Sequence, residues 1–194
     1  MKIRLILIAL VVLVAGCVSY AAVGPGALDY SGLRIETSQA WNLAPKEATP
    51  AARSESKVWT QDGILLDRIM IIPGIPSGDS LFKAVSGDQA LPVFKADMLP
   101  NEIEELTESS IAKLFGEGEV AVETTNLRPH RYGDNSGILF DMSVVVSDGP
   151  NYRGVTGAFV FAERLYLIFY LGAEPYYYKK HLDEALVIIK GAQV

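Results

Sequence analysis

The chain has 194 residues, a formal net charge of −6 at pH 7 and a single cysteine. This length is enough for one domain with a sizeable hydrophobic core. One cysteine excludes a disulfide within the chain, so the fold must depend on that core. The acidic balance disfavours nucleic acid or an anionic lipid surface as a partner.

The first sixteen residues have the pattern of an export signal. Lys2 and Arg4 precede an apolar run over residues 5–14, and small residues follow it. A cationic start, a short apolar run and small residues are typical of a secretory signal peptide. A membrane-spanning helix needs about 20 apolar residues, more than this run contains. Removal of residues 1–16 would leave 178 residues and change the net charge to −8, because two cations and no carboxylates are lost.

The residues that end this segment, Val14-Ala15-Gly16-Cys17, resemble the lipobox of bacterial lipoproteins. The resemblance implies that the signal is cut before Cys17 and that the thiol carries lipid, so that acyl chains anchor the protein to the membrane. Two or three acyl chains hold a protein firmly on a membrane, since each buried methylene contributes about 0.8 kcal/mol. A catalytic role for Cys17 is disfavoured because no histidine lies near it in this apolar segment. Val18 favours the outer membrane by the sorting rule of enteric lipoproteins.

Residues 17–29 are rich in Ala, Gly and Val, and we interpret them as a lipidated tether. A single globular domain is expected over residues 30–194. Alternating apolar residues predict a strand from Leu33, and polar residues predict a surface loop at 45–56. Asp62-Gly63 between two β-rich runs predicts a hairpin.

The remainder of the chain predicts a sheet with two helices. Apolar residues at helical spacing predict a helix from residue 99 to Gly116. Short β-rich runs joined by polar turns then predict an antiparallel meander. The runs Val144–Val146 and Leu165–Leu171 are uninterrupted, so we expect them to be buried on both faces, with helices covering the sheet.

A closing helix is expected at about residues 175–190. Its predicted apolar stripe consists of Tyr178, Leu182, Leu186 and Ile189. Its predicted polar side consists of Lys179, Lys180, Asp183 and Glu184.

The order of these elements resembles the PsbP-like (Mog-type) fold, an antiparallel sheet between helices. The resemblance rests on the early strand LRIETSQAW, the end of the meander AERLYLIFYLG and the closing helix YYYKKHLDEALVIIKG. It implies an α+β domain of α/β/α sandwich type. It implies no site, because a fold does not determine a function.

The string SGDSLF at residues 77–82 resembles the first block of the GDSL hydrolases, in which the serine is the nucleophile. Such a serine, here Ser80, needs a base and oxyanion donors. In that family Asp precedes the basic histidine by three residues, whereas Tyr178 precedes His181 here. The family's parallel sheet also conflicts with the predicted meander. An ordinary turn is favoured, and no catalytic residue is assigned.

Two further groups are candidate binding residues. Arg128, His130 and Arg131 could bind an anion, because arginine presents a fork of donors; a solvated loop is the alternative. Tyr176 and Tyr177 could form a partner or ligand surface, or pack the helix start against the sheet. Two histidines and one cysteine disfavour a transition-metal site, and no cofactor is expected.

The sequence therefore predicts a lipid-anchored, non-enzymatic binding or accessory module of the bacterial cell envelope, facing the periplasm. Its partner would be an envelope protein or a small ligand. The alternatives are an envelope hydrolase that uses Ser80 and a purely structural envelope component.

Overall fold

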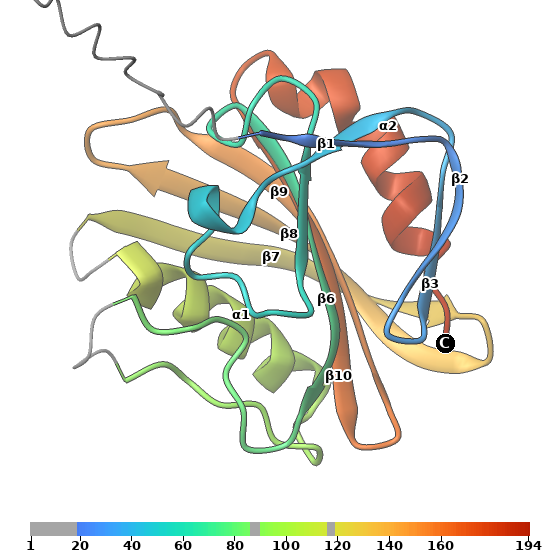
Figure 1. Ribbon diagram of the computed structural model, residues 1–194. Coiled ribbons are helices and arrows are strands. Elements are labelled where there is room, and N and C mark those ends of the chain that lie inside the picture. The colour runs from blue at the N-terminus through green and yellow to red at the C-terminus, as the bar shows by residue number, and fades with distance from the viewer. Residues whose placement is uncertain (1–18, 86–89, 116–118) are drawn as a thin grey trace, which may run out of the picture.

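The computed structural model describes residues 19–85, 90–115 and 119–194 and shows an α+β fold built on one twisted antiparallel sheet (Figure 1). The strands of this sheet are β1 (Ala21–Val23), β4 (Trp41–Leu43), β5 (Lys57–Thr60), β6 (Asp67–Pro76), β7 (Val120–Tyr132), β8 (Asn135–Val146), β9 (Tyr152–Phe161) and β10 (Arg164–Ala173). Their order across the sheet is β1-β4-β5-β6-β10-β9-β8-β7. The predicted meander and the predicted hairpin between β5 and β6 are both confirmed.

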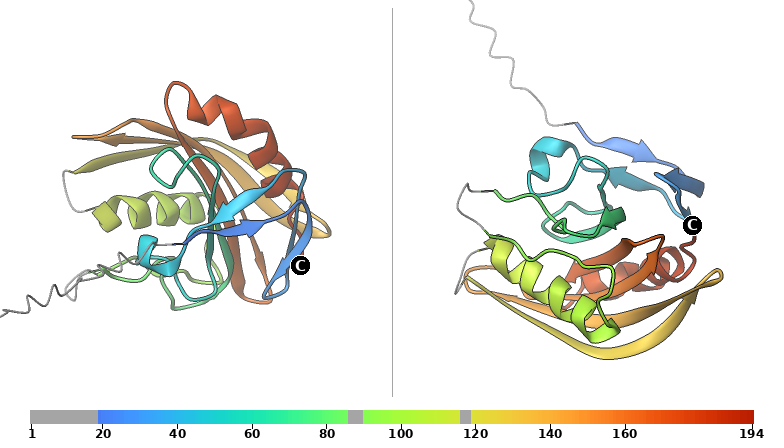
Figure 2. Two further views of the ribbon diagram at one scale, coloured as in Figure 1. Left: turned by 45° about the horizontal axis from the view of Figure 1, so that its top comes forward. Right: turned by 90° about the horizontal axis from the view of Figure 1, so that it is seen from below.

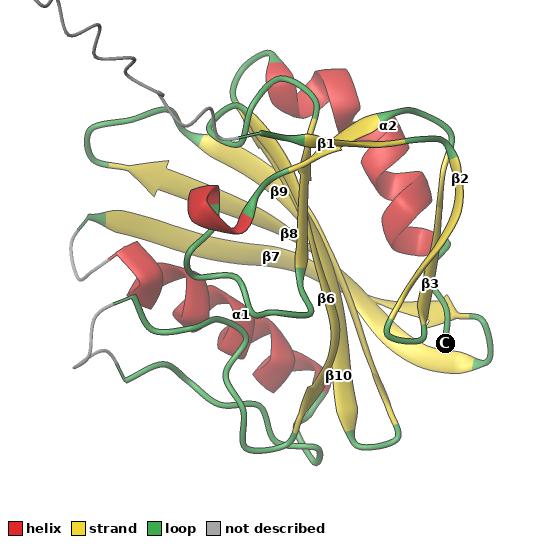
Figure 3. Cartoon of the chain, viewed as in Figure 1, coloured by secondary structure: helices red, strands yellow, loops and turns green. Residues whose placement is uncertain are grey.

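A two-stranded ribbon and the helices complete the described fold (Figure 3). The ribbon pairs β2 (Gly26–Tyr30) with β3 (Leu33–Thr37). The helices are α1 (Pro100–Phe115), α2 (Tyr177–Lys190) and the short η1 (Lys46–Ala48) in the predicted surface loop. In the described part of the chain, no helix combines the length and apolar character needed to span a bilayer.

The two long helices lie on opposite faces of the sheet and create two cores (Figure 2). Successive residues of a strand point to opposite faces. Along β10, Leu165, Leu167 and Phe169 accordingly join the core beneath α1, while Tyr166 and Ile168 join the core beneath α2. The expected burial of this run on both faces is confirmed.

The predicted burial of Val144–Val146 is only partly correct. Val144 is buried, but Val145 is 47% exposed. Val145 faces away from the α1 core near the end of β8, and α2 packs mainly on β9 and β10 rather than over this position.

The segment interpreted as a tether is mostly folded. Residues 21–23 form β1 against β4, and β2 begins at Gly26, so the domain starts at Ala21 rather than at residue 30. Ala and Gly have low β propensity. These strands therefore depend on partners that local sequence does not reveal.

The apolar stripe predicted for α2 is also corrected. The buried residues of α2 include His181 and Glu184, whereas Leu182 and Leu186 are only partly buried. Glu184 lies on the buried side because hydroxyl and backbone N–H donors of residues 37–39 satisfy its carboxylate.

Candidate functional site

An apolar pocket lies on the α1 face of the sheet, where α1 does not cover it. α1 packs against β7 and β8, and the segment 48–52 lies over the part of this face that β5, β6 and β10 form. The pocket between them has a volume of about 280 Å³. Its main apolar wall residues are Val58, Met70, Phe82, Ile111, Phe169 and Leu171.

One cation, Arg68, lines this pocket. Met70 belongs to the α1-side core, so Arg68, two residues earlier on β6, faces the same side. Its Nη1 donates a hydrogen bond to the carbonyl of Ile64 at 2.9 Å, and its Cζ lies 5.2 Å from the centroid of the Tyr152 ring. Burial lowers the pKa of this guanidinium, which Tyr152 partly opposes. Of the carboxylates that the structure describes, none forms an ion pair with Arg68.

A polar cluster lies on the opposite side of the β5–β6 hairpin, at the start of α2. The Asp62 carboxylate accepts hydrogen bonds from Lys180 Nζ at 2.7 Å and from His181 Nε2 at 2.6 Å. Burial acts to raise the pKa of Asp62, but these hydrogen bonds outweigh it, so the pKa lies below its ordinary value. The His181 ring also lies 6.0 Å from that of Trp41. The cluster therefore fastens the hairpin turn to α2.

The ligand atoms of Asp62, Asp67 and His181 lie within 4.8 Å of one another, a spacing that a metal ion could use. The buried Asp67 accepts three hydrogen bonds, from the Thr60 hydroxyl and from the backbone N–H groups of residues 61 and 62. Asp62 already binds the Lys180 ammonium. These oxygens already have hydrogen-bond donors, so the cluster forms a hydrogen-bond network in this structure.

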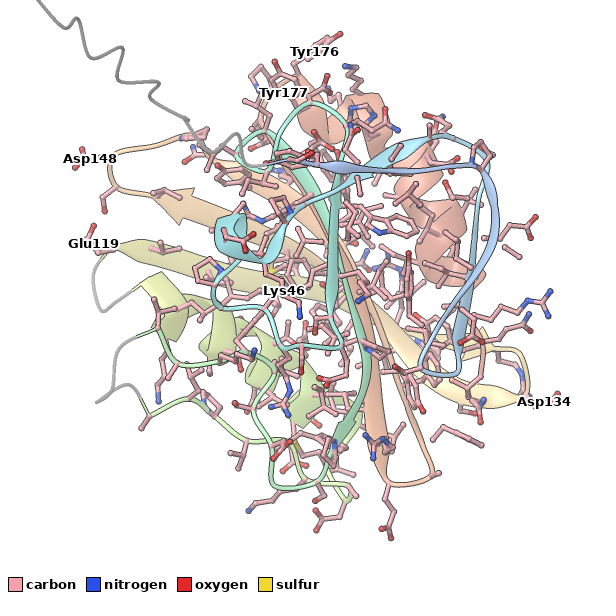
Figure 4. All side chains as sticks on the ribbon, in the orientation of Figure 1. Lys46, Glu119, Asp134, Asp148, Tyr176 and Tyr177 are labelled. Carbon is pink, nitrogen blue, oxygen red and sulfur yellow. The ribbon has the colours of Figure 1, made fainter. Side chains whose placement is uncertain are left out.

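The structure does not bring the three predicted anion-binding residues together. Arg128 and His130 lie on the α2 face of β7, and Arg131 starts from the opposite face. Arg128 pairs with Asp141 at 3.0 Å, and His130 Nε2 contacts the carbonyl of Lys190. Arg131 donates to the carbonyl of Asp134. Asp134 lies in the β7–β8 turn, at the edge of the molecule (Figure 4). Anion binding here stays a prediction.

Tyr176 and Tyr177 lie at an outer end of the molecule, at the start of α2 (Figure 4). Tyr176 is 62% exposed, and its ring meets that of Tyr177 edge to face at 5.2 Å. The Lys180 ammonium lies 5.8 Å from the ring centroid of Tyr176 and 5.9 Å from that of Tyr177. Tyr177 is partly buried and packs against the α1-side core. Tyr176 therefore fits the surface interpretation, and Tyr177 fits the packing one.

Ser80 follows the turn at residues 77–78 and forms an isolated β-bridge with Val93, and its hydroxyl donates to the carbonyl of Phe82 at 2.6 Å. Its own carbonyl accepts from Arg53, which also pairs with Asp79 at 2.6 Å. The imidazoles of His130 and His181 have other partners. The string therefore contains an ordinary turn, closed by the bond from the Asp79 N–H to the Pro76 carbonyl, and Ser80 comes directly after it. Cys17, the predicted lipidation site, lies outside the described residues.

The sequence offered one overlooked signal for the pocket. Asp67 and Arg68 interrupt the apolar run ILLDRIMIIPGI, which is otherwise typical of a buried strand. Charged residues are rarely buried without a partner or a function. Asp67 has its hydrogen-bond partners in the β5–β6 hairpin, whereas Arg68 lines the pocket.

Comparison with known proteins identifies the fold of the chain but assigns it to no family. No family model matches the chain, and no curated protein matches it. Among solved structures, it is similar to the solution structure of cyanobacterial PsbP (CyanoP) from Synechocystis sp. PCC 6803. The two share 12% sequence identity with a TM-score of 0.56, over 93% of this chain and 95% of the other. The chain therefore has a PsbP-like fold.

Proposed function

We propose that this chain is a lipid-anchored, non-enzymatic binding or accessory module of the bacterial cell envelope, facing the periplasm. The sequence Val14-Ala15-Gly16-Cys17 supports the anchor. The pocket beside Arg68 carries the binding role, because preformed apolar concavities with a few polar groups are the usual form of ligand sites.

The start of the folded domain gives this anchor a geometric consequence. β1 begins at Ala21, four residues after Cys17. An extended chain spans at most about 3.6 Å per residue, so these two residues lie within about 14 Å of each other. A lipidated Cys17 would hold the β1 edge of the domain next to the lipid surface. The acidic chain would then depend on its acyl chains, and not on basic residues, for attachment.

Binding is favoured over hydrolysis by the side chains around Ser80. Its hydroxyl donates to the backbone carbonyl of Phe82, and both histidines have their hydrogen-bond partners elsewhere. Nucleophilic catalysis needs a base within hydrogen-bond reach of the hydroxyl.

The anchor is tested by metabolic labelling in a bacterial host. We expect labelled palmitate to enter the wild-type chain and the chain to sediment with membranes. Cys17→Ser should abolish both, whereas Ser19→Ala, two residues away, should retain both. Palmitate incorporation into the Cys17→Ser chain would refute the proposed anchor.

The binding role is tested by crosslinking in intact envelopes followed by purification of the anchored chain. We expect a protein or a small ligand to co-purify with the wild type, and to be lost when Ala52→Leu fills the pocket. The Ser19→Ala chain serves as the matched control. Equal recovery from wild type and Ala52→Leu would show that the pocket is not the binding site, and an absence of any bound species would favour a purely structural role.

A further inference from the structure

The pocket combines an extended apolar wall with a single cation. Met70, Phe82, Phe169 and Leu171 supply wall that suits an aliphatic chain. Among the described residues that line it, Arg68 is the only charged one. A ligand that satisfies both features is long, apolar and negatively charged at one end.

Arg68 has unused capacity for such an anion. A guanidinium carries five N–H donors in a planar fork. The structure pairs it with the carbonyl of Ile64 and the ring of Tyr152, both of which are uncharged partners. Among the described residues, the partners of this partly buried cation are uncharged, so it gains from an added anion, because a carboxylate adds ion pairing and two parallel hydrogen bonds that a carbonyl or a ring does not supply.

The volume limits the length of the aliphatic part. A cavity of about 150 Å³ accepts benzene, and ligand pockets usually start at about 300 Å³. At about 280 Å³, this pocket accepts one chain of roughly ten carbons. A lipid with two acyl chains would not fit inside it.

We propose that the pocket binds a single-chain, medium-length alkyl carboxylate, with its carboxylate against Arg68 and its chain along Met70, Phe82 and Phe169. This inference rests on the proposed function, since it names the ligand class of the same binding module. A carboxylate matches the guanidinium fork through two parallel hydrogen bonds. The chain contributes through burial of about 25 cal/mol per Å² of apolar surface.

The test uses the unacylated chain of residues 17–194, which includes every helix and strand of the described structure. Its methionine methyl groups are labelled with ¹³C, and decanoate is added below its critical micelle concentration. We expect the Met70 methyl signal to shift as decanoate is added, until the shift reaches a plateau. The signal of Met142, which is buried in the α1-side core but does not line the pocket, should not move.

Two ligands with the same tail test the role of the head group without altering the protein. Decanol should bind at least about tenfold more weakly than decanoate, because it lacks the charge that pairs with Arg68. Equal affinity for decanol would overturn the proposal, and so would an unmoved Met70 signal. Tighter binding of decyl phosphate than of decanoate would overturn the assignment of the head group as a carboxylate.

Variants supply the second line of evidence. Arg68→Gln should weaken decanoate binding about tenfold or more, whereas Arg34→Gln, at an exposed position on β3, should not. Ala52→Leu should block binding with the guanidinium intact, and this second variant keeps the test valid if Arg68→Gln fails to fold. Unchanged affinity in a folded Arg68→Gln or Ala52→Leu chain would overturn the proposal. Failure to bind decanoate by a chain that still incorporates palmitate would refute this ligand and leave the anchor standing.

Discussion

Removal of the negative charge from Glu184 tests how α2 is held against the β3–β4 turn. The Glu184 carboxylate accepts hydrogen bonds from the Thr37 hydroxyl at 2.7 Å, the Ser38 backbone N–H at 2.7 Å and the Ser38 hydroxyl at 2.6 Å. A longer bond of 3.3 Å comes from the Gln39 backbone N–H. One carboxylate therefore satisfies most of the donors in this turn. We choose Glu184→Gln because it keeps the shape of the side chain and removes the charge.

The expected cost follows from the charge of the acceptor. Hydrogen bonds to charged groups contribute about 1.5–3 kcal/mol each, against about 1 kcal/mol for neutral pairs. Glutamine retains one acceptor oxygen for Thr37 and Ser38, and its NH₂ group replaces the other. We therefore expect Glu184→Gln to lower the free energy of unfolding by about 1–2 kcal/mol at pH 7. Glu184→Ala should cost about 3 kcal/mol or more, because it leaves these donors unsatisfied.

The dependence on pH gives the sharper measurement. Burial acts to raise the pKa of Glu184, but the hydrogen bonds from Ser38, Thr37 and Gln39 outweigh it and lower the pKa below its ordinary value of 4.5. A carboxyl whose pKa is lowered in the folded state binds fewer protons there than in the unfolded state. Its stabilisation is thus complete above about pH 4.5 and is lost as the pH falls through the lower folded-state pKa.

Urea unfolding between pH 7 and pH 3 should therefore show a difference between wild type and Glu184→Gln that is largest near neutrality and shrinks below pH 4.5. Asp183→Asn is the matched control, since Asp183 is the exposed neighbour on the same helix and its loss should change stability by less than about 0.5 kcal/mol. A difference that stays constant from pH 7 to pH 3 would refute the role of the charge. A Glu184→Gln chain as stable as wild type at pH 7 would refute the role of the carboxylate altogether.

Three further outcomes follow from other close contacts. Gly157→Ala should destabilise the fold by about 2 kcal/mol or more in urea, because its Cβ would collide with the Tyr132 hydroxyl and the Ile189 side chain of α2; Gly24→Ala, with open space around it, should be nearly neutral. Asp67→Ala should cost about 3 kcal/mol in thermal or urea unfolding, since it leaves the N–H groups of the β5–β6 turn without an acceptor, and a cost below 1 kcal/mol would contradict that role. A fluorophosphonate probe should leave the purified chain unlabelled, because the Ser80 hydroxyl is engaged by the Phe82 carbonyl and has no base beside it. Labelling that disappears in Ser80→Ala would instead establish the hydrolase alternative.

Local sequence was sufficient for the order of the main elements. The spacing of Ile103, Leu106 and Ile111 predicted α1, since a helical period places these residues on one face. Polar turns between β-rich runs predicted the four-strand meander, and the unbroken run Leu165–Leu171 predicted helices on both sides of it. In each case the signal is a period or a turn that neighbouring residues carry by themselves.

Features that need distant partners could not be predicted in this way. β1 is a strand because β4 pairs with it, and not because Ala21 and Ala22 favour one. His181 is buried because Asp62, 119 residues earlier, supplies its carboxylate partner. A hydrophobicity pattern assigns such polar residues to the solvent side of a helix, since it carries no information about donors and acceptors from elsewhere.

The candidate site likewise has features that the sequence alone reveals and features that need the tertiary structure. The amino-acid sequence by itself determined the predicted anchor, since a lipobox is recognised in an extended segment and needs no fold. It also contained Arg68, as a charge within an apolar strand. Only the tertiary structure placed Arg68 in a pocket, because the walls come from separate segments that include β5, β6, α1 and β10. A concave surface is made by the packing of distant segments against one another, so no local stretch of the chain encodes it.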